Sequence, residues 1–363
     1  MDVKGCYCTK TYIDCSGADF TEISVIYPYI TNNTYRIHIT GGRIRSLPDD
    51  LFEPSSLTGP LDKVTYLNLS GNNIETVGKE AFNQLPRLEI LDLSNNDIQV
   101  NLCEEKNDLS KSLAPLVNVN ELYLRHIFSK EVSGSCDPGN IFTGANMTRL
   151  KTLDLSSNGF DLVDSNMEQF LCDSYSIETL NLSRNYFAVL PVSPCMTNVV
   201  NLDLSYNTIS HLTAEDVDVI QSLVNLQVLK LGGNPFGCDC YQENTYIFLN
   251  TTTLGLDFDD IKCSGDSYDS DLVGKPIKRL KYTDMCEEPR IIVCYGPSGQ
   301  KIYLSKTTFI AGSAAGIVVL IIVVTVVVIV CRRRRRNRRQ PVTETNSQIV
   351  PAVAKSTAYT RMV

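Results

Sequence analysis

The stretch Leu150-Lys-Thr-Leu-Asp-Leu-Ser-Ser-Asn158 follows the pattern L-x-x-L-x-L-x-x-N. Leu153 and Leu155 alternate with polar residues, which is the two-residue period of a strand with one buried face. The Asn that follows can hydrogen-bond the backbone where the chain turns away. A single unit of this kind cannot bury its own leucines, so it predicts copies on both sides.

Copies of this stretch occur along much of the chain. The clear ones cover 64–72, 88–96, 177–185, 199–207 and 226–234, a degenerate first copy covers 34–42, and the copy at 119–127 lacks the Asn. Successive starts lie 22 to 31 residues apart. Repeats of this kind usually take roughly 20–29 residues. We therefore expect insertions in the three longest units, in the segment that returns to the next strand.

Residues 34–235 resemble the extracellular leucine-rich-repeat family, because the Asn and three apolar positions recur together. The resemblance implies the α/β class, as a right-handed solenoid of about eight repeats with a curved, parallel, concave sheet. Disulfide caps would close both ends of the solenoid, as in a Toll-like-receptor-type ectodomain. The predicted tail at 332–363, with 32 residues, is too short for a kinase or a Toll-type signalling domain.

The stretch after the last repeat resembles the family's cysteine-rich C-terminal cap. It reads Asn-Pro-Phe-Gly-Cys-Asp-Cys over 234–240, and Leu-Val-Gly follows at 272–274. The resemblance implies two bridges, Cys238–Cys263 and Cys240–Cys286. Such a lid is needed because the end of a solenoid would otherwise expose its leucine core.

Two further bridges are predicted from spacing. Cys172 and Cys195 lie five and four residues before their next strands, so they hold nearly the same register on adjacent coils. Neighbouring coils stack about 4.8 Å apart, and a disulfide needs Cα atoms roughly 4.4–6.8 Å apart. The same argument pairs Cys103 with Cys136. Buried free thiols are the alternative, but 13 cysteines and no tryptophan favour an oxidising compartment.

The N-terminal cysteines have the spacing C-x-C-x6-C. We assign Cys6 and Cys15 to disulfides, while the pairing of Cys8 and Cys294 stays open. The family's N-terminal cap usually has one more Cys before these, so we expect that the start is truncated. Residues 1–25 also contain no apolar core of signal-peptide length. We expect that a signal peptide was removed or that the sequence begins within the first exon of the gene.

Residues 309–330 form an uncharged, Val/Ile-rich run of 22 residues. At about 1.5 Å per residue it would span a bilayer core. A buried core helix is the alternative, but seven arginines within 332–339 favour a membrane span with a cytoplasmic C-terminal side. Nine bases and one acid lie in 332–363, which leaves 24 bases and 40 acids in 1–331, a net charge of −16.

These patterns predict a single-pass type I protein of the plasma membrane. The expected parts are an N-terminal cysteine cap (1–33), leucine-rich repeats (34–235), a C-terminal cysteine-rich cap (236–290), a stalk (291–308), a transmembrane helix (309–331) and a basic cytoplasmic tail (332–363).

The membrane run and the tail contain three short motifs. Gly312 and Gly316 form a G-x-x-x-G that would allow helix pairing and homo-association, although composition alone produces this motif often. Cys331 is a palmitoylation candidate, with a free thiol as the alternative. Tyr359 and Met362 resemble an endocytic Y-x-x-Φ signal or a phosphotyrosine motif, and patterns this short often arise by chance.

No catalytic, metal-binding or nucleotide-binding pattern is present. The three histidines fall in separate repeats, and neither a P-loop nor an H-E-x-x-H nor a G-x-S-x-G occurs. We therefore predict a non-enzyme with no cofactor, no metal and no nucleic-acid partner.

The predicted concave side is the candidate ligand surface, as is usual for repeat proteins. The middle of this side contains more acidic than basic residues, which would favour a partner with basic patches. The alternative is that L-D-L-S-x-N is simply the family's usual repeat sequence. The candidate residues are Asp92, Tyr123, Asp154, Asp203, Glu89, Glu121 and Glu178.

Five N-x-S/T sequons predict glycosylation, at Asn32, Asn68, Asn146, Asn181 and Asn250. Glycans at Asn68 and Asn181 would crowd the concave side. The sequence as a whole predicts a receptor or co-receptor for an extracellular protein or microbial ligand. The alternatives are a cell-adhesion protein and an auxiliary subunit of a membrane channel.

Overall fold

The computed structural model describes residues 5–49, 51–52, 61–104, 107–128, 137–265 and 270–286, together with the strands at 291–295 and 301–305. The chain divides into two units, 1–305 and 306–363, and every described residue belongs to the first.

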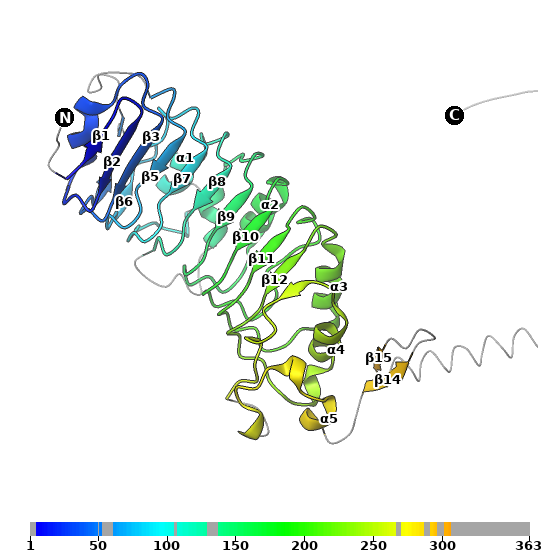
Figure 1. The fold of residues 1–363 in the computed structure, drawn as a ribbon. Helices are drawn as coiled ribbons and strands as arrows, with labels where there is room; N and C mark the ends of the chain where they lie inside the picture. The colour runs from blue at the N-terminus through cyan, green and yellow to red at the C-terminus, as the bar shows by residue number, and fades with distance from the viewer. Residues whose placement is uncertain are drawn as a thin grey trace, which may run out of the picture. The chain divides into compact units, whose positions relative to one another are not determined.

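The predicted repeat strands form one continuous sheet in which neighbours follow chain order (Figure 1). The repeat strands are β3 (Arg36–Thr40), β5 (Tyr66–Asn68), β7 (Ile90–Asp92), β8 (Glu121–Tyr123), β9 (Thr152–Asp154), β10 (Thr179–Asn181), β11 (Asn201–Asp203) and β12 (Val228–Lys230). All of them pair in parallel. Core leucine lies opposite core leucine, as in Leu122↔Leu153 and Leu153↔Leu180, except in β3, where Ile37 lies opposite Leu67. The parallel leucine-rich-repeat sheet is therefore confirmed.

The sheet continues beyond the repeat strands at both ends, into the segments predicted as caps. β2 (Tyr12–Ser16) pairs in parallel with β3, and β1 (Tyr7–Cys8) adds an antiparallel strand at that edge. At the other end β13 (Gly255–Leu256) pairs in parallel with β12. Two smaller pairs are also present, β4 (Ser46–Leu47) with β6 (Thr76–Val77) in parallel, and β14 (Ile291–Tyr295) with β15 (Lys301–Ser305) antiparallel.

Helices occupy the returning segments of the longer repeats and the C-terminal cap. They are α1 (Asp108–Leu113), α2 (Ser165–Asp173), α3 (Ala214–Ser222), α4 (Glu243–Thr251) and α5 (Tyr282–Met285), with 3₁₀ turns at Ile23–Tyr29, Pro138–Phe142, Cys240–Gln242, Ser270–Leu272 and Ile277–Arg279. Asn107, Asp164 and Thr213 cap the first three helices through side-chain oxygens that accept backbone N–H groups.

A ladder of buried asparagines joins adjacent coils behind the sheet. Its members are Asn72, Asn96, Asn158, Asn185, Asn207 and Asn234, each at most 5% exposed. The Asn185 side chain accepts from the N–H groups of Asn158 (3.0 Å) and Phe160 (3.1 Å) in the preceding coil. Its amide donates to the carbonyls of Leu182 (2.9 Å) and Leu155 (3.1 Å). The final Asn of the repeat pattern is thus the polar connection between coils.

The cysteine bridges agree with the sequence predictions where the structure describes both partners. The described bridges are Cys6–Cys15, Cys172–Cys195, Cys238–Cys263 and Cys240–Cys286. The Cα atoms of Cys172 and Cys195 are 5.4 Å apart, as their equal register on adjacent coils requires. Cys103 is disulfide-bonded, and Cys136 lies outside the described residues.

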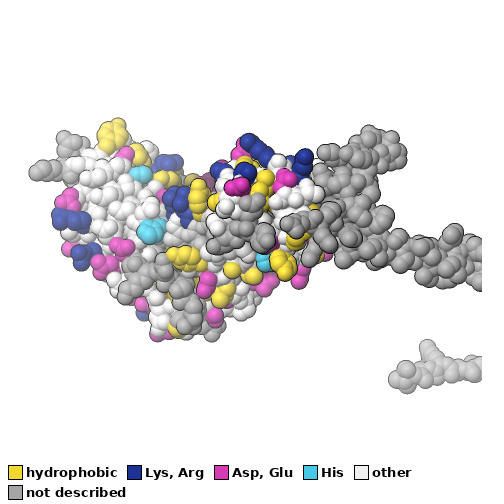
Figure 2. Space-filling view, turned by 90° about the horizontal axis from the view of Figure 1, so that it is seen from below, with side chains coloured by type: hydrophobic (Ala, Val, Ile, Leu, Met, Phe, Trp, Pro, Cys, Tyr) yellow, Lys and Arg dark blue, Asp and Glu magenta, His cyan; other side chains and the backbone are white. Residues whose placement is uncertain are grey.

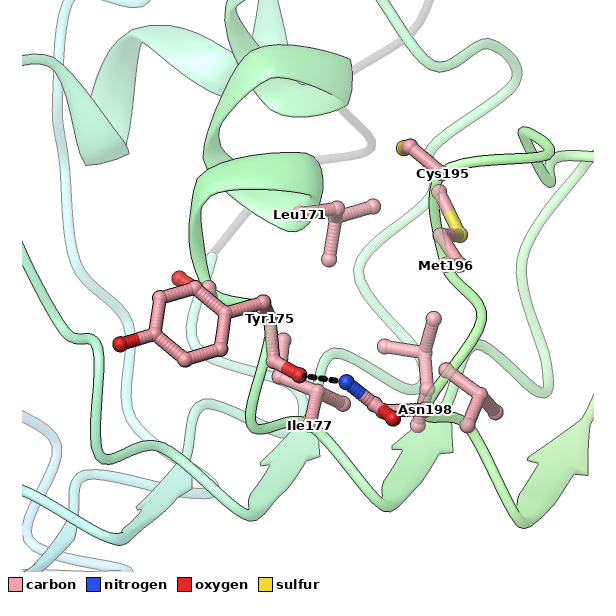
Figure 3. Close-up of a pocket in the computed structure, with 9 residues that line it drawn as sticks. Leu171, Tyr175, Ile177, Cys195, Met196 and Asn198 are labelled. Carbon is pink, nitrogen blue, oxygen red and sulfur yellow. Dashed lines mark hydrogen bonds between the residues drawn. The ribbon is translucent and has the colours of Figure 1, made fainter. Parts of the chain in front are cut away.

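The Cys172–Cys195 bridge lies beside a second polar ladder, at the edge where the chain enters the strands. The Asn198 amide donates to the Tyr175 carbonyl at 2.6 Å (Figure 3). Asn225 donates in the same way to Thr197 at 2.9 Å, and Asn118 donates to Pro86 at 2.8 Å. The gap between Leu171, Ile177 and Met196 measures about 10 Å³. A space of that size holds about one water molecule, so it is not a ligand site.

Within the described residues, no helix is both long enough and apolar enough to cross a membrane. The predicted membrane segment 309–331 and the tail 332–363 lie outside the described residues. The same is true of the predicted motif residues Gly312, Gly316, Cys331, Tyr359 and Met362.

Candidate functional site

The outward side chains of β2, β3, β5 and β7 to β12 form a continuous surface, called here the sheet face. Its central row runs Asp14, His38, Asn68, Asp92, Tyr123, Asp154, Asn181, Asp203 and Lys230, each beside the next in strand register. The structure therefore brings together the four candidate residues of the central row. Glu121 begins the strand of Tyr123, and Glu89 and Glu178 directly precede β7 and β10.

Each aspartate of this row has a structural role through one carboxylate oxygen. Oδ1 of Asp92, Asp154 and Asp203 accepts the backbone N–H two residues later, at 2.9, 2.9 and 3.0 Å. Asn68 and Asn181 make the same turn with their amide oxygens. The recurrence of Asp-Leu-Ser thus has a local cause, since the side chain fixes the turn that ends each strand.

The second carboxylate oxygen distinguishes the four aspartates of the row. Asp14 Oδ2 accepts from the Tyr12 hydroxyl at 2.9 Å. Asp92 Oδ2 accepts from the Asn68 amide at 2.9 Å, and Asp203 Oδ2 pairs with Lys230 at 2.9 Å. In the described part of the chain, Asp154 is hydrogen-bonded only through its other oxygen, to the turn. The carboxylate of Asp154 is therefore the one in this row that keeps an oxygen for a ligand.

Tyr123 lies between Asp92 and Asp154 in strand register. Its hydroxyl donates to Glu121 Oε2 at 2.8 Å. Partial burial, followed by that hydrogen bond and the charges of Glu121, Asp92 and Asp154, raises the pKa of Tyr123 to about 12. These four residues, Asp92, Glu121, Tyr123 and Asp154, are called here the acidic patch.

The raised pKa of Tyr123 makes the stability of the fold depend on pH in the alkaline range. Because the phenol holds its proton more tightly when folded, its contribution is complete below the ordinary value of 10.0 and is lost as the pH rises through about 12. Glu121→Gln removes the neighbouring charge and should lower the pKa of Tyr123. Tyrosinate absorbance during an alkaline titration measures it, with Tyr123→Phe identifying the signal. An unchanged titration in Glu121→Gln would contradict this assignment.

A second cluster on the sheet face was not anticipated from the sequence. The Arg36 guanidinium lies 4.0 Å from the ring centroid of Tyr66. The His38 ring is parallel to the same ring, at 6.3 Å between centroids and 5° between planes. These residues, Arg36, His38 and Tyr66, are called here the aromatic–basic cluster. The repeat pattern could have predicted this cluster. Arg36 and His38 are two residues apart on one strand and therefore face the same side, and Arg36 and Tyr66 occupy the same register on adjacent strands.

The charge on the face seen in Figure 2 is mixed. Acidic and basic side chains are interspersed in the space-filling view and do not form a field of one sign (Figure 2). Lys151 pairs with the predicted site residue Glu178 at 3.0 Å. The described residues contain no group of three or more His, Cys, Asp or Glu that could hold a metal ion.

The five sequons differ in how accessible their amide nitrogens are. Asn68 is 8% exposed, and its nitrogen donates to Asp92 and to the Tyr66 hydroxyl (3.3 Å). The Asn250 nitrogen donates to the Tyr246 carbonyl at 2.8 Å, while Asn32 and Asn146 are exposed. Asn181 is half-buried.

We expect glycopeptide mapping of the secreted or surface form to find glycans at Asn32 and Asn146 and none at Asn68. Each glycan replaces one N–H of its amide. The Asn68 side chain is buried, and both hydrogens of its amide are donated to neighbouring side chains. Full occupancy at Asn68 would show that its amide does not keep both hydrogen bonds, to Asp92 and to Tyr66, in the mature protein.

Sequence comparison relates the chain to leucine-rich-repeat proteins. The Leucine rich repeat family model matches residues 32–98. Trophoblast glycoprotein of Macaca fascicularis is 26% identical over 269 residues, which cover 71% of this chain and 62% of that protein. Human Toll-like receptor 1 is 28% identical over 198 residues, 53% of this chain and 22% of the receptor. Transforming growth factor beta activator LRRC33 of Danio rerio is 26% identical over 224 residues, 57% and 32% of the two chains.

Structural comparison supports the fold. The crystal structure of human 5T4 (Wnt-activated inhibitory factor 1, Trophoblast glycoprotein) matches with a TM-score of 0.65 at 24% identity, over 79% of this chain and 99% of the other. This likeness concerns the fold alone. The chain spans less than two thirds of the length of the three sequence relatives, at 62%, 32% and 22%.

Proposed function

Since the chain belongs to the extracellular leucine-rich-repeat family, we propose that it is a cell-surface recognition receptor or co-receptor. Its ligand is an extracellular protein or a microbial macromolecule, which docks on the sheet face. The relatives support a receptor or ligand-binding role in general, because they include proteins named as Toll-like receptors and as an activator of transforming growth factor beta.

The acidic patch is the observation that carries this proposal. Asp154 has an oxygen with no hydrogen-bond partner in the described residues, next to a tyrosine whose pKa is raised partly by the surrounding carboxylates. A Lys or Arg of the ligand would relieve that local excess of negative charge. Tyr66 and Arg36 extend the surface with side chains of the kind that dominate binding energy in interfaces.

The proposed topology follows the charge pattern of the sequence. Residues 1–308 are extracellular, 309–331 cross the plasma membrane once, and 332–363 are cytoplasmic. In this arrangement Gly312 and Gly316 lie in the membrane, where they support homo-association, and Cys331 lies at the inner surface. Tyr359 and Met362 are then available to cytoplasmic adaptors.

Site-specific photo-crosslinking on living cells tests the sheet face directly. A benzophenone amino acid replaces Thr152, which lies between Glu121 and Thr179 in register, and in a control it replaces Val224, which is 78% exposed at the strand-entry edge. We expect a covalent adduct with an extracellular macromolecule from position 152 and none from position 224. Adducts from 224 alone, or none from 152, would overturn the proposal.

A further inference from the structure

A groove of about 360 Å³ lies between the last repeat and the C-terminal cap. Its wall includes Tyr206, Gly233, Pro235, Val273 and one residue of each charge, Asp260 and Lys262. Tyr206 and Gly233 follow β11 and β12, in the turns where the chain leaves those strands, so the groove is separate from the central row of the sheet face. It is called here the exit groove.

The walls of the exit groove are held by the fold. Cys263 lines it and is bridged to Cys238, and the Cys263 N–H donates to the Lys275 carbonyl at 3.0 Å. Asn234, also in the wall, is a member of the buried ladder and donates to Leu204 and Leu231 at 2.9 and 2.8 Å. A preformed groove costs a ligand little ordering free energy.

Tyr206 is an unusual residue for its backbone position. Its φ is 56°, in the left-handed region, and the equivalent turns of other repeats hold Gly71, Asn95, His126, Ser157, Arg184 and Gly233, so Tyr206 is the largest aromatic side chain at this position. A bulky side chain is disfavoured there, so the fold itself would be served better by Gly or Asn. Tyr206 is nevertheless 54% exposed, and its ring lies so close to Gly233 that a Cβ there would come within 2.6 Å of the ring.

Arg184 is not part of the groove wall but lies over the ring of Tyr206, which is part of it, with its guanidinium carbon 4.3 Å from the centroid. Its backbone is also left-handed, at φ 57°. Among the described residues no carboxylate pairs with Arg184, whereas Lys262 in the groove pairs with Asp260 at 3.2 Å. A guanidinium held on an aromatic face keeps its planar set of N–H donors for bidentate pairing with a carboxylate.

We propose that the exit groove is a second binding site, for an extracellular protein segment that carries an acidic residue beside an apolar one. The apolar side chain enters the groove against Tyr206 and Val273, and the carboxylate pairs with Arg184. This site goes beyond the proposed sheet-face function and has the opposite charge preference, because the acidic patch favours a basic ligand. Tyr and Arg, which bind here, are the residue types enriched at the energetic centres of interfaces.

A displayed random-peptide library selected on cells that express the full chain tests this proposal. We expect enriched peptides to contain Asp or Glu next to an aliphatic or aromatic residue. Arg184→Gln and Tyr206→Asn should each weaken their binding by roughly thirtyfold, the loss typical of a hot-spot residue. Asn suits the left-handed turn, as Asn95 shows at φ 54°, so Tyr206→Asn should fold normally and melt at the same or a higher temperature.

Asp154→Asn, which alters only the sheet face, separates the two sites. Peptide binding that survives Asp154→Asn and falls in Arg184→Gln supports the exit groove. The proposal is overturned if no enriched peptide contains an acidic residue beside an apolar one. It is also overturned if such peptides bind Arg184→Gln as well as wild type, if they lose binding to Asp154→Asn, or if the selection yields no binder.

Discussion

Leu155→Asp should unfold the middle repeats. The Leu155 side chain is fully buried, at 0% exposure, between the coils of β9 and its neighbours. A carboxylate at this buried position must be protonated or remain without a charged partner. The substitution also removes a packed aliphatic side chain from the core. Together these effects should cost more than about 4 kcal/mol, which is a large part of the stability of a typical domain. Because each repeat is stabilised by its neighbours, the damage should spread to the adjacent coils.

Ser157→Asp is the matched control for this prediction. It introduces the same carboxylate two residues later, at a half-exposed position with φ 60°, which Asp tolerates. We expect its free energy of unfolding to stay within about 0.5 kcal/mol of wild type. Denaturant unfolding followed by circular dichroism measures both variants. Equal stability of the two would contradict the placement of Leu155 in the core.

Asn185→Ala should be the second most damaging change among those considered. It leaves the buried N–H groups of Asn158 and Phe160 without their acceptor, in a position that is 3% exposed. Each unsatisfied buried group costs about 1–3 kcal/mol, so the expected loss is about 3–5 kcal/mol. The Leu155 and Leu182 carbonyls suffer less, since they also accept from Asn158 and Asn207.

Asn198→Ala removes the same side chain from the exposed ladder at the strand-entry edge. That amide makes a hydrogen bond to Tyr175, and its loss leaves the carbonyl accessible to water. The expected cost is about 1 kcal/mol or less. If Asn198→Ala proved as destabilising as Asn185→Ala, the buried ladder would not be the main polar connection between coils.

Much of the fold could be predicted from the sequence because its contacts are local and repeated. The position of Leu153 and Leu155 within one unit defines the strand, and the repeat places each strand beside the next. The same regularity located Cys172 opposite Cys195, since equal register on adjacent coils implies closeness. The helices in the returning segments were harder to predict from the sequence, because the insertions between strands have no common period.

The candidate site was only partly predictable. The sequence placed Asp92, Asp154 and Asp203 in one row, but their differences depend on neighbouring coils. Lys230 forms an ion pair with Asp203, while the Asn68 amide donates a hydrogen bond to the second carboxylate oxygen of Asp92. The stacking of Arg184 on Tyr206 was equally hidden, since it joins two turns through a backbone conformation that neither residue type favours.

The proposed role of the acidic patch is tested most directly by removing its charge while keeping its turns. In Asp92→Asn with Glu121→Gln and Asp154→Asn, the amide oxygens can still accept the turn N–H groups, as Asn68 and Asn181 do. The measurement is the yield of the adduct photo-crosslinked from position 152 on cells. We predict a fall of at least about tenfold at unchanged surface expression, since charge pairing and steering are both lost. An undiminished yield would contradict the account and leave the aspartates with their structural role in the turns alone.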